Sequence, residues 1–254
     1  MTVRVEVVGR GPDLTMLHGW GLNSAVWNGL RDALAERFTL HIVDLPGHGH
    51  SATTAITTIG AMMNDVARAI PLRSHLLGWS LGGQVALEIA RCHPDRVNKL
   101  LLVATTPCFM QRENWPHAVS PDVLADFGSS LLNDTAATIR RFLALQVLSR
   151  PNMRDKMAIL QREVTSRGNA GTAALAAGLE ILRATDLRER LASIEHDSLV
   201  LQGEHDGLTP EPAGRWLATK LPNARYVMLS GAAHTPFLSH PAAFLQELDC
   251  FLAS

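Results

Sequence analysis

The sequence lacks any uninterrupted apolar run of the roughly 18 residues that a membrane-spanning helix requires. Residues 1–13 alternate in polarity and contain no apolar stretch of signal-peptide length. The net charge at pH 7 is only −1, which gives no global electrostatic reason to bind nucleic acid or a membrane. We therefore expect a cytoplasmic protein with neither kind of partner.

Cysteine is scarce as well. The chain has three cysteines, Cys92, Cys108 and Cys250, which are far apart and show no CxxC or Cys/His spacing typical of zinc. We expect them to pack as small apolar residues in a reducing compartment, and we expect no metal. The odd count leaves one alternative open, which is a secreted protein with one disulfide and one free thiol.

Short apolar runs alternate with helical patterns at both ends of the chain. Strands are expected near 3–7, 14–17, 38–43, 76–79 and 97–104, with helices at 25–35, where Ser24 can act as the cap, and at 59–70. The alternation returns with strands at 198–201 and 226–229 and helices at 212–221 and 241–252. This order predicts βαβ units, and hence an α/β fold with a mostly parallel central sheet flanked by helices.

The middle of the chain breaks this alternation. Residues 109–190 contain no convincing strand and show helical patterns at 123–132, 138–148, 153–164 and 171–182. We therefore expect an α/β core in two parts, 1–108 and 191–254, interrupted by a helical insertion at 109–190. The inserted helices are expected to form a lid over the carboxyl ends of the strands, where open α/β sheets bind ligands.

A G-x-S-x-G pattern, from Gly78 to Gly82, follows the apolar run that contains Leu76 and precedes a helical pattern. Strand, sharp turn and helix are the context that a strained serine nucleophile requires, because the turn lifts the hydroxyl clear of the sheet. The two glycines lack a Cβ and let strand and helix approach closely. We interpret Ser80 as a nucleophile; the alternative is a serine in a turn that only links two elements.

A serine hydroxyl needs a base, and the base needs a carboxylate to orient it. Asp206 and His234 each follow a late strand, in the order serine, acid, histidine that this kind of fold uses. Glu204 is the rival acid. His205 and His240 are rival bases, although His205 adjoins the acid too closely to be held by it, and His240 is better explained as the start of the last helix.

Acyl transfer also requires backbone N–H groups that meet the developing oxyanion. We expect one from Leu81, directly after the serine at a helix start, and the other from Trp20 in the loop His18–Gly21. Gly21 lets that backbone bend, and His18 is expected to brace the loop rather than react. The alternative is an ordinary strand-to-helix loop.

Several segments resemble known families. LHGWGLN, VDLPGHGHS, LGWSLGG, DGLTP and AAHTPF are together similar to the α/β-hydrolase superfamily. Lid segments narrow the resemblance to the pimeloyl-[acyl-carrier protein] methyl ester esterases of biotin synthesis; these segments are TPCF, NWP, PDVLADF, RFLALQ, GLEIL and TDLR. The resemblance covers nearly the whole chain and implies the α/β-hydrolase fold with a helical lid.

The resemblance also implies an activity. Members of this family are serine carboxylesterases that release methanol from the pimeloyl methyl ester carried by acyl carrier protein, by a Ser-His-Asp acyl-enzyme mechanism without a cofactor. It implies a monomer whose partner is that carrier protein. The residues that it implies for substrate binding are Trp20, Ser80, Leu81, His234 and the segment Phe142, Leu143, Ala144, Leu145 and Gln146.

The family uses lid arginines against the acidic carrier protein, and Arg141 and Arg154 match two of those positions. Ala137 and Ala158 stand at two others, so this chain departs from the family pattern there. Residues 140–167 hold seven basic and two acidic residues, a net charge of +5, so the rest of the chain carries −6. We expect this surface to attract the carrier protein; a solvated helical surface with incidental charge is the alternative.

Two other functions remain open from the sequence. One is a hydrolase of the same fold that acts on other small esters, lactones or C–C bonds. The other is a binding protein that keeps the fold but catalyses no reaction. The presence of all three of Ser80, Asp206 and His234 argues against it.

Overall fold

The computed structural model describes residues 3–51, 56–145, 153–168 and 170–253, without the side chains of 143–145 and 153–157. Within these ranges one seven-stranded sheet has the order β1-β3-β2-β4-β5-β6-β7. Its strands are β1 (Val5–Gly9), β2 (Asp13–Leu17), β3 (Thr39–Val43), β4 (Ser74–Trp79), β5 (Val97–Val103), β6 (Ser198–Gly203) and β7 (Ala224–Leu229). Only β1 is antiparallel to its neighbour, which confirms the mostly parallel sheet.

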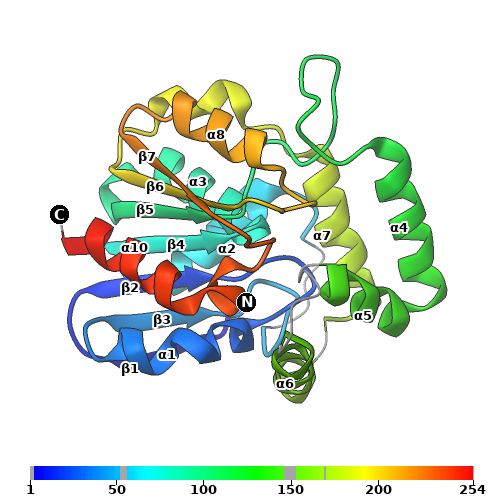
Figure 1. Ribbon diagram of the computed structural model, residues 1–254, viewed down its shortest axis with the longest axis horizontal. Helices are drawn as coiled ribbons and strands as arrows, with labels where there is room; N and C mark the ends of the chain where they lie inside the picture. Colours follow the sequence, from blue (N-terminus) through cyan, green and yellow to red (C-terminus); the bar gives the residue numbers. More distant parts are fainter. Residues whose placement is uncertain (1–2, 52–55, 146–152, 169, 254) are drawn as a thin grey trace.

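Helices cover both faces of the sheet (Figure 1). On one face lie α1 (Asn28–Ala35) and α10 (Pro241–Ala253). On the other lie α2 (Ile59–Ala69), α3 (Leu81–Cys92) and α8 (Glu211–Lys220). Two separate hydrophobic clusters therefore hold the sheet between them.

The central strands contribute to both clusters because successive side chains of a strand point to opposite faces. On β4, Leu76 packs beneath α2 and α3, whereas the next residue, Leu77, packs beneath α1 and α10. Leu101 lies opposite Leu77 across the β4–β5 pair and joins the same cluster. Burial on both faces explains why these strands are continuous apolar runs in the sequence rather than alternating patterns.

In the described part of the chain between β5 and β6, four α-helices lie within the region predicted as a helical insertion. They are α4 (Pro121–Asn133), α5 (Thr135–Leu145), α6 (Met153–Ser166) and α7 (Thr172–Ala184), and we call them the lid helices. The described part of 109–190 contains isolated bridges but no strand. Figure 1 shows the lid helices gathered at one end of the sheet.

The start of the helix after β2 differs from the prediction. Asn23, not Ser24, caps the 3-10 turn Ser24–Trp27 that precedes α1, because its side-chain oxygen accepts the N–H of Ala25 at 3.1 Å; α1 itself begins after Trp27 without a side-chain cap. Ser24 already belongs to a short 3-10 turn, and its own N–H donates to the carboxylate of Asp44 at 2.7 Å. Both residue types are good caps, so only the backbone conformation decides between them.

The prediction that all three cysteines pack as apolar residues is wrong for two of them. Cys108 is buried, but Cys92 and Cys250 lie exposed near the ends of α3 and α10. All three are free thiols. Among the described residues, no helix combines the length and hydrophobicity needed to cross a membrane.

Candidate active site

Ser80 occupies the sharp turn between β4 and α3, with a left-handed backbone (φ 56°, ψ −119°). A non-glycine residue in this region is strained by about 1–3 kcal/mol and persists only where its surroundings hold it. Here the Ser80 N–H donates to the carbonyl of Val103 at 3.0 Å, and the Ser80 carbonyl accepts the hydroxyl of Thr105 at 2.7 Å. The turn is therefore fastened to β5 and to the loop that follows it.

Glycines make this turn sterically feasible. A Cβ on Gly78 would collide with the carbonyl of Gly82, and a Cβ on Gly82 would collide with the carbonyl of Leu17. On Gly83 it would lie 2.5 Å from the hydroxyl oxygen of Thr105. The helix consequently begins in direct contact with the neighbouring strand ends, as the sequence pattern predicts.

Ser80, His234 and Asp206 form one buried hydrogen-bonded chain. Nε2 of His234 lies 3.0 Å from Oγ of Ser80, and Nδ1 lies 2.8 Å from Oδ2 of Asp206. The three residues are 8 %, 1 % and 5 % exposed. The structure thus brings together residues from three separate strand ends, and this geometry is that of a nucleophile, a base and its orienting acid.

The surroundings of Asp206 define the tautomer of the histidine. Oδ1 accepts the backbone N–H groups of Leu208 and Thr209, both at 2.9 Å. Oδ2 accepts the amide of Gln202 at 2.8 Å and the hydroxyl of Thr209 at 2.7 Å. With both oxygens acting as acceptors, the proton between Asp206 and His234 belongs on Nδ1, which leaves Nε2 free to accept from the serine.

Three residues that support this chain were not singled out from the sequence. Gln202 and Thr209 hold the carboxylate, and the indole N–H of Trp79 donates to the carbonyl of His234 at 2.8 Å. The contact with Thr209 had a detectable signal, since an aspartate in a turn tends to accept backbone N–H groups that follow it closely in the chain. Gln202 and Trp79 had none: no sequence pattern marks a glutamine four residues before an aspartate as its donor, and the Trp79 indole meets a residue 155 positions away.

The rival acid and bases lie elsewhere. The Glu204 carboxylate accepts the hydroxyl of Ser230 and the N–H of Gly231, both at 2.7 Å, on the protein surface. The ring of His205 is 3.8 Å from that same carboxylate. The carbonyl of His240 accepts the N–H of Phe244 in the first turn of α10.

The 18–21 loop lies against the serine. A Cβ on Gly19 would be only 3.2 Å from Cβ of Ser80, so the backbone next to Trp20 passes directly beside the nucleophile. Leu81 is the first residue of α3, where the N–H has no acceptor within the helix. Both predicted oxyanion donors therefore belong to backbone that adjoins Ser80, while their role stays a prediction.

Two buried histidines brace this loop. Nε2 of His18 accepts the N–H of Leu45 at 2.9 Å, so its Nδ1 carries the proton and donates to the carbonyl of Gly19 at 2.7 Å. Nε2 of His48 accepts the N–H of Gly21 at 3.2 Å. Burial lowers the pKa of both rings, that of His48 to about 3, so both are neutral and keep one acceptor nitrogen.

The lid contributes aromatic contacts near the site. The Phe142 ring lies 5.1 Å from the Trp20 ring, edge to face. Of the other residues implied for substrate binding, Leu143, Ala144 and Leu145 belong to α5, but their side chains lie outside the described part, as does the whole of Gln146.

The basic surface is described only in part. Arg140 and Arg141 are exposed on α5, and Arg162 is exposed on α6. Arg154 belongs to α6, but its side chain lies outside the described part. Arg167 does not belong to an exposed patch, because its guanidinium pairs with Glu6 at 2.8 Å and thereby ties the end of α6 to β1.

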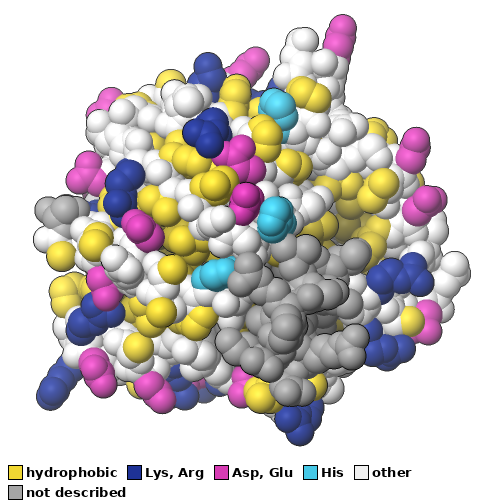
Figure 2. Space-filling model, viewed as in Figure 1, with side chains coloured by type: hydrophobic (Ala, Val, Ile, Leu, Met, Phe, Trp, Pro, Cys, Tyr) yellow, Lys and Arg dark blue, Asp and Glu magenta, His cyan; other side chains and the backbone are white. Residues whose placement is uncertain are grey.

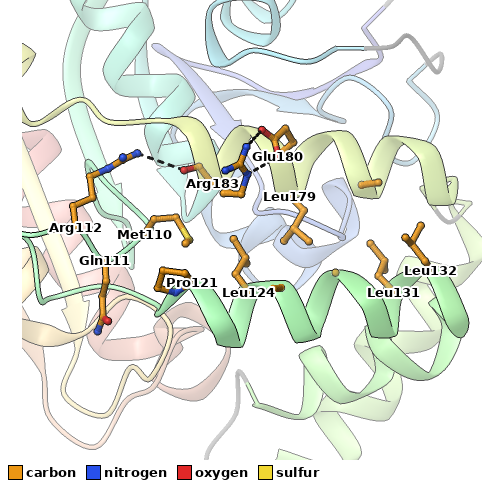
Figure 3. A pocket seen from close by; sticks show the side chains of 13 residues that line it. Met110, Gln111, Arg112, Pro121, Leu124, Leu131, Leu132, Leu179, Glu180 and Arg183 are labelled. Atoms are coloured by element: carbon orange, nitrogen blue, oxygen red, sulfur yellow. Dashed lines mark hydrogen bonds and ion pairs between the residues drawn. The ribbon is translucent and has the colours of Figure 1, made fainter.

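A separate cavity of about 590 Å³ opens between α4 and α7. Leu124 and Leu131 of α4 face Leu179 of α7 across it, with Arg112 and Arg183 at one end (Figure 3). Figure 2 shows a hollow with hydrophobic side chains on this side of the molecule. None of Ser80, Asp206 and His234 lines it.

The residues described by the structure contain no cluster of three or more His, Cys, Asp or Glu side chains arranged to hold a metal ion. The groups that converge at Ser80 are a hydroxyl and an imidazole nitrogen within hydrogen-bond distance of each other, with a carboxylate on the far side of the ring. An arrangement of this kind can carry out acyl transfer.

Comparison with known proteins identifies the family of the chain. The chain matches the alpha/beta hydrolase fold family over residues 14–241 and is an α/β hydrolase. It is 42 % identical to the pimeloyl-[acyl-carrier protein] methyl ester esterase of Aeromonas hydrophila, over 99 % of this chain and 100 % of the relative. The corresponding esterase of Nitrosomonas europaea is also 42 % identical, over 98 % of both chains.

The chain therefore belongs to the family of pimeloyl-[acyl-carrier protein] methyl ester esterases. Among solved structures, an esterase from Exiguobacterium antarcticum superimposes with a TM-score of 0.91. The match covers 99 % of this chain and 96 % of that one, at 24 % identity, and so supports the fold alone.

The neutral state of His48 predicts a pH-dependent stability. An unfolded histidine has a pKa of about 6.5, so below that pH the unfolded chain binds a proton that the folded protein, with its pKa of about 3, does not. The free energy of unfolding should fall by up to about 1.4 kcal/mol per pH unit between pH 6.5 and 3 from this residue.

His48→Gln should remove that part of the slope, measured by urea unfolding at pH 7 and pH 5. His50→Gln is the matched control, because its side chain is 58 % exposed and its replacement should leave the slope unchanged. Equal slopes for the wild type and His48→Gln would contradict the prediction.

Proposed function

We propose that this protein hydrolyses the methyl ester of pimeloyl-[acyl-carrier protein], giving methanol and the free ω-carboxylate, in biotin synthesis. The observation that carries the proposal is the buried chain from Asp206 through His234 to Ser80. The 42 % identity to esterases named for this substrate supports the choice of ester.

The first half of the reaction forms an acyl-enzyme. As Ser80 Oγ attacks the ester carbonyl, its proton passes to Nε2 of His234 over the 3.0 Å hydrogen bond. Asp206 holds Nδ1 and stabilises the imidazolium that results. The N–H groups of Trp20 and Leu81 stabilise the oxyanion, which forms beside both backbones.

Collapse of the tetrahedral intermediate breaks the bond to the leaving group. His234 then gives its proton to the departing methoxide, which leaves as methanol. The same nitrogen next deprotonates a water, which attacks the acyl-enzyme, and returns that proton to Ser80 as the carboxylate is released. The histidine therefore ends the cycle in the tautomer in which it began.

The proposal includes the carrier protein as partner. The exposed arginines of α5, Arg140 and Arg141, lie on the helix that also carries Phe142 to the Trp20 ring. A carrier protein held by this surface would place its acyl arm between lid and core. We further propose that the protein works as a monomer in the cytoplasm, where three free thiols suit a reducing environment.

Ser80→Ala should lower turnover of the carrier-bound methyl ester by at least about 10³-fold, because the members of a triad act as a unit. Methanol release measures this, and circular dichroism checks that the fold persists. The wild-type gene should also restore biotin-free growth to a bacterium that lacks this esterase, whereas Ser80→Ala should not. Near wild-type turnover by Ser80→Ala would contradict the proposed mechanism. If the wild-type enzyme hydrolysed esters but its gene did not restore biotin-free growth, its substrate in the cell would be a different ester.

Asp206→Asn should lower turnover by orders of magnitude, because an amide oriented by the same donors no longer favours the proton on Nδ1 of His234. Glu204→Gln is the matched control, since that carboxylate contacts Ser230 and Gly231 instead. Kinetics with a p-nitrophenyl ester compare the two. The reverse order of effects would mean that the acid is wrongly assigned.

Charge reversal at Arg141 and Arg154 should raise KM for the carrier-bound ester and leave a small free ester nearly unaffected, because attraction between charged surfaces acts mainly on encounter. Added salt should reproduce the effect, given a Debye length of about 8 Å at physiological salt. Arg215→Glu, on the surface of α8, is the control. Equal losses on both substrates would assign the arginines to the lid or the site instead.

A further inference from the structure

Trp20 connects the site with the lid. Its backbone belongs to the 18–21 loop beside Ser80, the residue as a whole is only 2 % exposed, and its indole points into the lid helices. The indole N–H donates to the carbonyl of Leu175, near the start of α7, at 2.9 Å. One residue thus has its main chain at the proposed oxyanion hole and its side chain hydrogen-bonded to a lid helix.

Three lid helices enclose the indole. Phe127 of α4 and Phe142 of α5 meet it edge to face, with ring centroids 5.4 and 5.1 Å away. On α7, a Cβ at Gly178 would lie 2.7 Å from Cδ1 of Trp20 and 3.0 Å from Nε1. The backbone of α7 therefore contacts the indole without space for even one methyl group.

The rest of the loop is held from the core side. Nε2 of His48 accepts the N–H of Gly21, and His18 holds the carbonyl of Gly19. The residues on either side of Trp20 are therefore fastened to the core, while the indole between them is fastened to α7. Because lid residues pack around the indole, its side-chain torsions have little room to change, and a displacement of the ring is passed in part to the Trp20 backbone.

The opposite face of α7 is less tightly supported. Ala176 and Leu179, one turn of helix apart, line the cavity that separates α7 from α4 (Figure 3). Leu175 and Gly178, on the face toward Trp20, are buried. The contacts with Trp20 consequently define where α7 sits more strictly than its packing against α4 does.

We propose that α7 positions the oxyanion hole: Gly178 and the carbonyl of Leu175 hold the Trp20 indole and thereby aim the Trp20 N–H at the reacting carbonyl. This inference rests on the proposed function, in which that N–H is a donor. Gly178 and Leu175 are positioning residues, since they act through Trp20 and not on the substrate. The arrangement of the lid then determines the stabilisation of the transition state as well as access to the site.

Gly178→Ala tests the proposal with a soluble p-nitrophenyl ester, which needs no carrier protein. The added methyl group displaces the indole, and a misaligned oxyanion donor should lower kcat roughly tenfold to a hundredfold. KM should change less than about twofold, because the donor acts on charge that develops only in the transition state.

Gly128→Ala is the matched control. It places the same methyl group in the middle of a lid helix, with the same gain in helix propensity, but its Cβ would meet only Leu179 at an ordinary 3.4 Å. This variant should keep wild-type kcat. If Gly178→Ala matched Gly128→Ala in kcat, the proposal would be overturned.

Two further readouts separate positioning from misfolding. Titration with a fluorophosphonate should count a full complement of reactive serines in Gly178→Ala, and a trifluoromethyl ketone, which forms an oxyanion on the serine, should bind more weakly by the factor lost in kcat. The proposal would be overturned if Gly178→Ala had fewer reactive serines than the wild type, enough to explain its lower kcat, and still bound the ketone as tightly as the wild type.

Trp20→Phe keeps the proposal testable if Gly178→Ala does not fold. It removes the N–H that donates to the carbonyl of Leu175 on α7 and should lower kcat several-fold; an unchanged kcat would overturn the proposal. A wild type that does not turn over the ester would instead refute the proposed function, so the two failures are distinguishable.

Discussion

Close contact between the end of β4 and the start of α3 is the constraint on which the site depends. The left-handed turn at Ser80 exists because Gly78 and Gly82 let backbone pack on backbone, and because β5 fastens the turn from the side. The helix then starts at Leu81, so its first N–H groups lie beside the hydroxyl. In the proposed function, one local geometry therefore supplies both the nucleophile and an anion-stabilising environment.

Buried hydrogen-bonded side chains fix the positions of the acid and of the 18–21 loop relative to that turn. Asp206 has both oxygens occupied by donors from its own loop and from β6, so it presents the histidine with a fixed acceptor. His18 and His48 stay neutral because burial lowers their pKa values, and each uses its unprotonated nitrogen to hold a backbone N–H. Such networks impose a unique geometry because an unpaired buried polar group is costly.

Contacts that take no part in the proton transfers tie the lid to this core, and two of them lie at the end of α6 and on α7. The end of α6 is held by the ion pair of Arg167 with Glu6, and α7 is held by the indole of Trp20. The charged surface of α5 and the aromatic contacts around Trp20 therefore belong to one unit. In the proposed function this unit receives the carrier protein on its outer side and faces the ester on its inner side.

The sequence by itself determined the mostly parallel sheet, because strands buried on both faces must be continuous apolar runs. It also indicated Ser80, Asp206 and His234, since parallel strands bring their carboxyl ends to one edge. Only the tertiary structure decided that Asn23 caps the 3-10 turn before α1, that Gln202 donates to Asp206, and that the Trp20 indole is hydrogen-bonded to α7. The first two contacts are short-range, but they depend on a backbone conformation that the residue types alone do not specify. The third joins residues 155 positions apart, and a local pattern carries no information about such a contact.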